Sequence, residues 1–310
     1  MTTTGRVTLS DVAAASGVSR ATVSFVLRDS PTQSISPATR ERVRQAARDL
    51  GYVPNGIARA LREGSSRIVV LSLDAGLDGH YARSYIRGLD AELAARDHVL
   101  LVRYEHGDTR SDQQVLDAIR PRAVLRFGEP YLTGHELDDT GGGWQDGLAA
   151  HVAAQLGYLA DRGHSGIALA LPDRDTPLRD VRLSFANQAA ERRGLAPVLP
   201  LPVPVTRTTA AGSLRQFLAA NPGVTAVAAF DDDVALRVLA AAGDLGLAVP
   251  AGLAVIGFDA SEHGALATPP LTTVRIDAEA HGRRAARALL GLDAADLSPA
   301  PGQVIVRASA

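Results

Sequence analysis

Residues 9–28 read LSDVAAASGVSRATVSFVLR, and this stretch decides the fold of the N-terminal part of the chain. Its apolar residues recur at helical spacing but are interrupted at Gly17, which suits a tight turn because glycine adopts positive φ without strain. Ser10 can cap a first helix with Asp11 in its first turn, and Ser19 can cap a second helix. The spacing predicts a helix-turn-helix, with an ordinary helical hairpin as the alternative.

A third helix is expected to follow. Ser36 suits its N-cap, Pro37 suits its first helical position and Gly51 suits its end. Its predicted buried stripe consists of Val43, Ala47 and Leu50. Three arginines recur every four residues along the helix, and they can either contact phosphates or remain solvated: Arg40, Arg44 and Arg48.

Charge is distributed unevenly along the 310 residues. Residues 1–64 carry nine Arg against five acidic residues, a formal charge of +4, whereas residues 65–310 carry a formal charge of −6. A basic head on an acidic body favours contact between the head and a polyanion such as nucleic acid, although a modest charge run is also typical of a solvated face. The chain contains no cysteine, which excludes disulfide scaffolds and thiol chemistry.

The first 62 residues resemble the lactose-repressor (LacI/GalR) family of bacterial transcription regulators. Four segments carry the resemblance: VTLSDVAAASGVSRATVSFVL, SPATRERV, GYVPN and ARAL. It implies a helix-turn-helix DNA-binding domain over residues 1–54 and a hinge helix over 55–64. The second helix would lie in the major groove of DNA.

Ten DNA-contacting residues follow from this resemblance, position by position. The implied base-facing residues are Arg20, Ala21 and Phe25; an arginine can pair with guanine, and apolar side chains can contact a thymine methyl group. The implied phosphate donors are Thr8, Ser19, Thr22, Ser24 and Asn55. In the hinge, Ala58 and Leu61 would enter the minor groove, with Leu61 as a wedge between base pairs. The alternative for Leu61 is a plain linker, and Ser19 can also act purely as a helix cap.

From residue 65 onward, short apolar strands alternate with helices, which predicts an α/β fold with parallel sheets. The segment contains no G-x-G-x-x-G after a strand, no Walker loop and no paired metal-ligand spacing, so we expect no enzyme activity, no cofactor and no metal. The expected strands are 68–73, 99–104, 123–127, 166–171, 197–205, 226–230, 253–258, 271–276 and 304–307. The expected helices are 81–96, 111–119, 148–162, 181–193, 211–220, 233–245 and 278–292.

The family resemblance continues in YLADRGHSGIAL, in FDDDVALRVLAAAGDLGLAVPAGLAVIGFD and in TPPLTTVRI. It implies a two-subdomain, periplasmic-binding-protein-like body over 65–310 that binds an effector and forms the dimer. Subdomain N is expected over about 65–163 and 261–275, and subdomain C over about 164–260 and 276–310. The implied effector-binding residues are Arg182, Asp231, Asp232 and Asp259, although Asp232 can instead serve to begin a helix.

The function expected from these features is a dimeric, sequence-specific regulator, most simply a repressor, that binds a pseudo-palindromic double-stranded DNA operator. A sugar or related metabolite is expected to modulate its DNA affinity. The N-terminal MTTTGRVTLSDV lacks the pattern of a signal peptide and no apolar run is long enough to span a bilayer, so we expect a cytoplasmic protein without membrane contact. The alternatives are an effector-independent regulator with a degenerate pocket and a solute-binding receptor.

Overall fold

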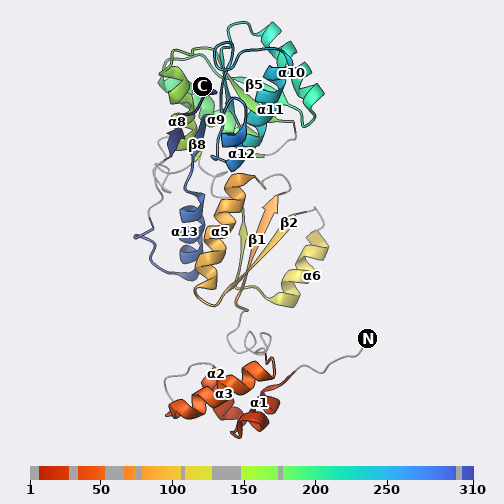
Figure 1. Ribbon diagram of the computed structural model, residues 1–310, viewed down its shortest axis with the longest axis vertical. Helices are drawn as coiled ribbons and strands as arrows, with labels where there is room; N and C mark the ends of the chain where they lie inside the picture. The colour runs from red at the N-terminus through yellow and green to blue at the C-terminus, as the bar shows by residue number, and fades with distance from the viewer. Residues whose placement is uncertain are drawn as a thin grey trace. The chain divides into compact units, whose positions relative to one another are not determined.

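The computed structural model describes residues 7–27, 34–52, 66–74, 79–105, 109–127, 148–173, 177–297 and 302–310. Contacts divide the chain into two compact units, Met1–Ser66 and Arg67–Ala310, drawn in red to orange and in orange to blue in Figure 1. The division falls two residues from the expected start of the body at residue 65. The expected hinge at 55–64, with Asn55, Ala58 and Leu61, lies outside the described residues.

The first unit contains α1 (Leu9–Ser16), α2 (Arg20–Leu27) and α3 (Pro37–Asp49). Gly17 ends α1 at φ +66°, in the left-handed region that glycine tolerates, and thereby turns the chain into α2. The predicted helix-turn-helix is confirmed. The three helices share one small aliphatic core, made of Val12, Ala13, Val23, Val26, Val43 and Ala47.

Two sequence-based details of this unit are wrong. The cap of α1 is Thr8 and not Ser10: the Thr8 backbone N–H donates to Asp11 Oδ2 at 2.7 Å, and the two residues form a reciprocal capping box. Leu50 does not join the buried stripe, because it is the C-cap of α3 and is 38% exposed. The Ser36 cap of α3 is confirmed, since Ser36 Oγ accepts the Thr39 N–H at 3.2 Å.

The second unit contains two parallel sheets, each at the centre of what we call a subdomain. The first subdomain has strand order β2-β1-β3, with Val69 opposite Leu100 on one side and Ala123 on the other. Helices α5 and α13 lie side by side against this sheet (Figure 1), and their side chains complete its apolar core. The elements are β1 (Ile68–Asp74), α5 (His80–Ala94), β2 (Val99–Glu105), α6 (Thr109–Ile119), β3 (Ala123–Arg126) and α13 (Ala278–Leu290).

The second subdomain has strand order β5-β4-β6-β7, and its sheet is covered on both faces. Alternate residues of β4 point to opposite faces: Leu169 packs among residues of α8 and α9, whereas Ala170 packs among residues of α10 and α11. The elements are α8 (Leu148–Ala160), β4 (Ile167–Pro172), α9 (Pro177–Arg192), β5 (Leu199–Val203), α10 (Arg207–Ala220), β6 (Ala226–Ala229), α11 (Asp232–Asp244), β7 (Ala254–Ile256), α12 (Glu262–Leu266), β8 (Thr273–Arg275) and β9 (Gln303–Ile305).

The expected division of the body into subdomains needs correction. Helix α8 lies within the range expected in subdomain N, yet Leu156 is fully buried in the core of the second subdomain. Strand β8 pairs antiparallel with β9 in that subdomain, and Val274 joins the same core. Helix α13 was expected in subdomain C, but Ala286 is buried in the core of the first subdomain. The described chain therefore crosses between the subdomains after β3, after β8 and after α13. No helix within the described ranges is long and apolar enough to cross a membrane.

Candidate functional site

One face of α2 is exposed on the first unit and presents the residues expected to read DNA bases. Arg20 and Ala21 are exposed and Phe25 is half-buried, whereas Val23 and Val26 anchor the opposite face in the core. The spacing i, i+1 and i+5 places the three outward residues on one side of the helix. The helix is thus held by its apolar face and leaves a cation, a methyl group and an aromatic ring for a partner.

The hydroxyl groups expected to contact phosphates already take part in helix capping. Ser19 Oγ accepts the Thr22 N–H at 3.1 Å, and the two hydroxyl oxygens lie 2.9 Å apart. The Thr8 hydroxyl donates to Asp11 Oδ2 at 2.7 Å, and the backbone and side-chain hydrogen bonds from Thr8 hold the pKa of Asp11 below its usual value. Both roles proposed for Ser19 fit this geometry, because a hydroxyl that accepts in a cap can still donate to a phosphate. Ser24 is half-buried on α2.

The arginines of α3 serve more than one purpose. Arg48 Nη2 lies 2.7 Å from Glu41 Oε1 on the same exposed face, so this pair contributes little to stability. Arg42 Nε donates to the Ser16 carbonyl oxygen at 2.9 Å and thereby ties α3 to the last turn of α1.

A cavity lies between the two subdomains of the second unit. The cavity and its mouth hold about 670 Å³ of empty space, part of it open to solvent. Phe230 and Asp231 follow β6, and Phe258 and Asp259 follow β7, so this wall forms at the carboxyl ends of parallel strands, where such sheets bind ligands. The other lining residues are Gly79, Tyr81, Ala82, Phe127, Leu148, His151, Leu178, Arg182, Ile276 and His281.

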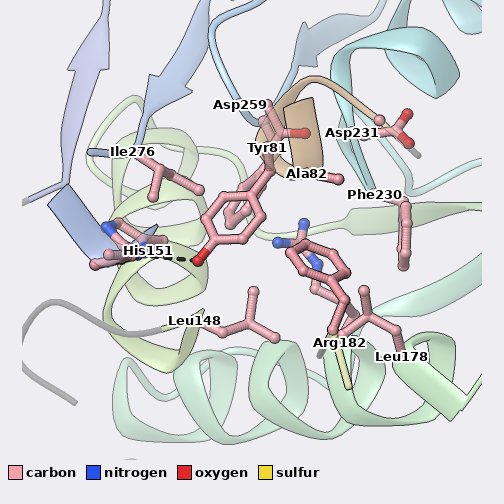
Figure 2. Close-up of a pocket in the computed structure, with 14 residues that line it drawn as sticks. Tyr81, Ala82, Leu148, His151, Leu178, Arg182, Phe230, Asp231, Asp259 and Ile276 are labelled. Atoms are coloured by element: carbon pink, nitrogen blue, oxygen red, sulfur yellow. Dashed lines mark hydrogen bonds between the residues drawn. The ribbon is translucent and has the colours of Figure 1, made fainter. Parts of the chain in front are cut away.

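Arg182 is the central cation of this cavity (Figure 2). Its side chain is 1% exposed, and Nη2 donates to Gln155 Oε1 at 3.2 Å and to the Ala229 carbonyl oxygen at 3.1 Å. The guanidinium carbon lies 3.6 Å from the centre of the Phe258 ring, a cation–π geometry. Within the described part of the chain, Nε and Nη1 have no hydrogen-bond partner. Two buried donors of a charged group are thus left for a ligand, since burying them unsatisfied is costly.

Two carboxylates share this wall with Arg182. Asp231 caps α11, since its Oδ1 accepts the Val234 N–H at 2.7 Å. Asp259 adopts φ +98°, an unusual backbone angle for a non-glycine residue. Burial is the main cause that raises the pKa of both groups above the ordinary aspartate value; for Asp259 the neighbouring carboxylates of Asp231 and Asp232 raise it further, while Arg182 opposes the shift. Burial lowers the pKa of Arg182, and both aspartates oppose that shift.

Two family models match the chain. The one described as bacterial regulatory proteins, lacI family, matches residues 8–55, and the periplasmic binding protein-like domain matches residues 156–310. The transcriptional regulator CelR of Thermobifida fusca is 30% identical to the chain and the alignment covers 92% of this chain and 91% of the relative. The regulator GntR of Pseudomonas aeruginosa is 31% identical, with 94% and 90% covered. This chain belongs to the lacI family.

Solved structures agree with this membership of the lacI family. A lac repressor dimer bound to operator superimposes with a TM-score of 0.75 over 98% of this chain and 99% of that chain, and its 22% identity supports the shared fold. A complex of the transcriptional regulator CelR with cellobiose gives a TM-score of 0.61 at 26% identity, over 98% of this chain and 100% of that chain. The lacI-family protein described here is accordingly a DNA-binding transcriptional regulator with a periplasmic-binding-protein-like body.

Within this lacI-family body, the structure separates the four expected effector-binding residues. Arg182, Asp231 and Asp259 line the cavity, but Asp232 does not. The Asp232 carboxylate is buried and accepts three hydrogen bonds from the segments around it: from Phe258 N at 2.8 Å, Ser261 N at 2.6 Å and Thr273 Oγ1 at 2.6 Å. Its assignment to the effector is wrong, because these bonds use both oxygens to hold the loop after β7 against α11 and β8.

Sequence reasoning missed several residues that line the cavity or hold its lining in place in this lacI-family member. Gln155 is fully buried and orients Arg182, while its own Nε2 donates to the carbonyl oxygens of Ala229 at 2.9 Å and Gly257 at 3.0 Å. On the opposite side, the Tyr81 hydroxyl lies 2.9 Å from His281 Nδ1, which links α5 to α13. One sequence signal could have indicated buried polar residues near the site. His151 and Gln155 lie one helical turn apart in an otherwise apolar segment, LAAHVAAQLGYLA.

Proposed function

We propose that this chain is a repressor that binds a pseudo-palindromic operator as a homodimer, with α2 in the major groove of each half-site. The observation that carries the proposal is the outward face of α2, where Arg20 and Ala21 are exposed and Phe25 is half-buried. The buried valines on the other face fix the helix in the core. Arg20 suits a guanine, and the hydroxyl groups of Thr8, Ser19, Thr22 and Ser24 suit phosphates. Such a protein acts in the cytoplasm and requires no catalytic group.

The hinge is proposed on sequence resemblance alone. Asn55 would contact a phosphate, and Ala58 and Leu61 would enter the minor groove at the centre of the operator. A leucine wedge costs a few kcal/mol of base unstacking, which the contacts to bent DNA offset.

We further propose that a sugar-like metabolite binds the cavity and sets the affinity for DNA. Arg182 offers two donors, and Asp231 and Asp259 offer acceptors, which together suit hydroxyl groups. The relative whose structure contains cellobiose supports a carbohydrate as effector. An effector-independent regulator is disfavoured by the cost of leaving buried Arg182 donors unpaired, and the basic N-terminal unit disfavours a solute-binding receptor.

The test is a selection of bound fragments from the genome of the source organism, at near-physiological salt, with the natural protein and Arg20→Ala in parallel. We expect the natural protein to enrich one palindrome and the variant to bind it more weakly, by about 1–3 kcal/mol, with relaxed preference at one position of each half-site. Identical enrichment by both proteins would contradict the assignment of Arg20, and enrichment of no sequence, with or without metabolite extract, would contradict the proposed function.

A further inference from the structure

The cavity wall formed by the second subdomain carries more negative than positive charge. Asp231 and Asp259 line this wall, the carboxylates of Asp231 and of the neighbouring Asp232 raise the pKa of Asp259, and Arg182 is the one arginine among the described lining residues. Asp232 accepts hydrogen bonds from uncharged donors alone, so it neutralises no cation. One guanidinium therefore meets two half-buried carboxyl groups in the cavity lining, and a third carboxyl group, that of Asp232, is buried next to them.

Other charged groups around this wall do not neutralise its excess negative charge. Asp233, at the start of α11, is exposed and adds a further negative charge, and Arg237 is the additional cation that acts on Asp231. Arg237 is half-buried outside the cavity lining. The facing wall from α5, β3 and α13 presents Tyr81, Phe127 and His281. A positive charge at the cavity side of the carboxylates would lower the cost of keeping them ionised.

The remaining surface of the cavity suits such a charge. Aromatic rings attract cations to their faces, and four aromatic residues besides the histidines line the space: Tyr81, Phe127, Phe230 and Phe258. The Phe258 ring already stacks on Arg182, and the Phe230 ring centre lies 5.6 Å from the same guanidinium carbon. Carboxylates beside aromatic faces are the ordinary chemistry of ammonium recognition.

Arg182 adds a second requirement. Its unpartnered Nε and Nη1 need acceptor atoms on the ligand, and hydroxyl oxygens supply these. We propose that the effector is an amine-bearing polyol, an amino sugar in type, whose ammonium group lies against Asp231 and Asp259 while its hydroxyl oxygens accept from Arg182. This inference rests on the proposed effector function of the same cavity and narrows its ligand to a cationic class.

The experiment measures binding of glucosamine, galactosamine and mannosamine to the full-length protein by calorimetry, below about pH 7, where an amine with a pKa of about 7.7–8.0 is protonated. Each amine is compared with its parent hexose, which lacks the charge, and with its N-acetyl derivative, which lacks the charge and adds bulk. At least one amino sugar should bind about tenfold or more tightly than both neutral counterparts, as expected for a hydrogen bond between charged groups.

Two matched variants locate the charge effect. Asp231→Asn keeps the shape and the cap of α11 but removes one carboxylate of the cavity, so the preference for the amine should fall by about tenfold. Asp233→Asn removes the exposed neighbouring carboxylate and should keep the preference. Melting curves of each variant verify that it is folded.

Equal binding of a neutral hexose would overturn the inference while leaving the proposed effector site in place. Absence of binding by all three amines would overturn the inference as well, and so would an unchanged preference in the folded Asp231→Asn variant. Operator selection tests the proposed function separately, since it depends on the first unit and needs none of these sugars.

Discussion

At the scale of single residues, Asp259 combines a rare backbone angle with a raised pKa. A carboxyl group whose pKa is higher in the folded than in the unfolded state makes the protein less stable as pH rises above the unfolded value, 3.8. Asp259→Asn removes this loss, and asparagine tolerates positive φ. The variant should therefore gain free energy of unfolding over the natural protein from about pH 4 to pH 7, measured by urea denaturation.

Asp244 supplies the control with the opposite sign. It is exposed, and hydrogen bonds from Arg207, including Nε to Oδ2 at 2.8 Å, lower its pKa. A lowered pKa contributes stability above the unfolded pKa and loses it on acidification. Asp244→Asn should thus reduce stability slightly at neutral pH and make no difference in acid. If the free energy of unfolding of Asp259→Asn differed from that of the natural protein by the same amount at every pH from about 4 to 7, Asp259 would not resist ionisation in the folded state.

At the scale of elements, two glycines set the contact of α5 with α13. A Cβ atom at Gly282 would lie 2.1 Å from the Tyr85 carbonyl oxygen, and one at Gly88 would lie 2.0 Å from that of Glu279. Gly282→Ala should destabilise the second unit by about 1–3 kcal/mol, as overpacking against rigid backbone does. Gly212→Ala in α10, where no atom lies within 4 Å, should instead stabilise by roughly 0.5–1 kcal/mol. Thermal denaturation of both variants measures these opposite changes in stability. Equal changes in the two variants would contradict the prediction.

These glycines also explain what the sequence could and could not predict. Strands and helices were predicted within a few residues because their apolar periodicity is local; β1, expected over 68–73, spans Ile68–Asp74. The subdomain membership of α13 depends instead on the close contact of α5 with α13 at Gly88 and Gly282. The apolar periodicity of a single helix does not indicate which other helix it contacts. The short α12 and the antiparallel pairing of β8 with β9 were missed because each involves only three to five residues.

The candidate sites divide in the same way. Arg182, Asp231 and Asp259 could be placed in the cavity because each matched a motif near the end of a strand or on the helix beside it. The role of Gln155 could not be predicted, because it arises only when α8 packs against the carboxyl ends of β6 and β7, more than 70 residues away in sequence. Asp232 was misassigned because a motif gives the position of a side chain but not its hydrogen-bond partners.

At the scale of the whole molecule, regulation requires that ligand and operator influence each other's binding. This coupling is a free energy shared by the two sites, so the factor by which an effector changes operator affinity must equal the factor by which operator changes effector affinity. A ligand shifts the protein only through contacts that differ between its two states. In the cavity, Arg182 is the group with donors left for such contacts.

Arg182→Ala should therefore abolish the response, so that the operator affinity is the same with and without the effector. Fluorescence anisotropy titrations of labelled operator, with the effector absent or saturating for the natural protein, measure this. Arg182→Lys should also respond poorly, because an ammonium group cannot reproduce the planar donors of a guanidinium. Arg193→Ala is the matched control: Arg193 directly follows α9, pairs with Asp161 at 2.7 Å on the surface and lies outside the cavity lining, so its loss should leave the response intact. A full response in a folded Arg182→Ala variant would mean that the effector acts through another site, because no other arginine of the described chain lines this cavity.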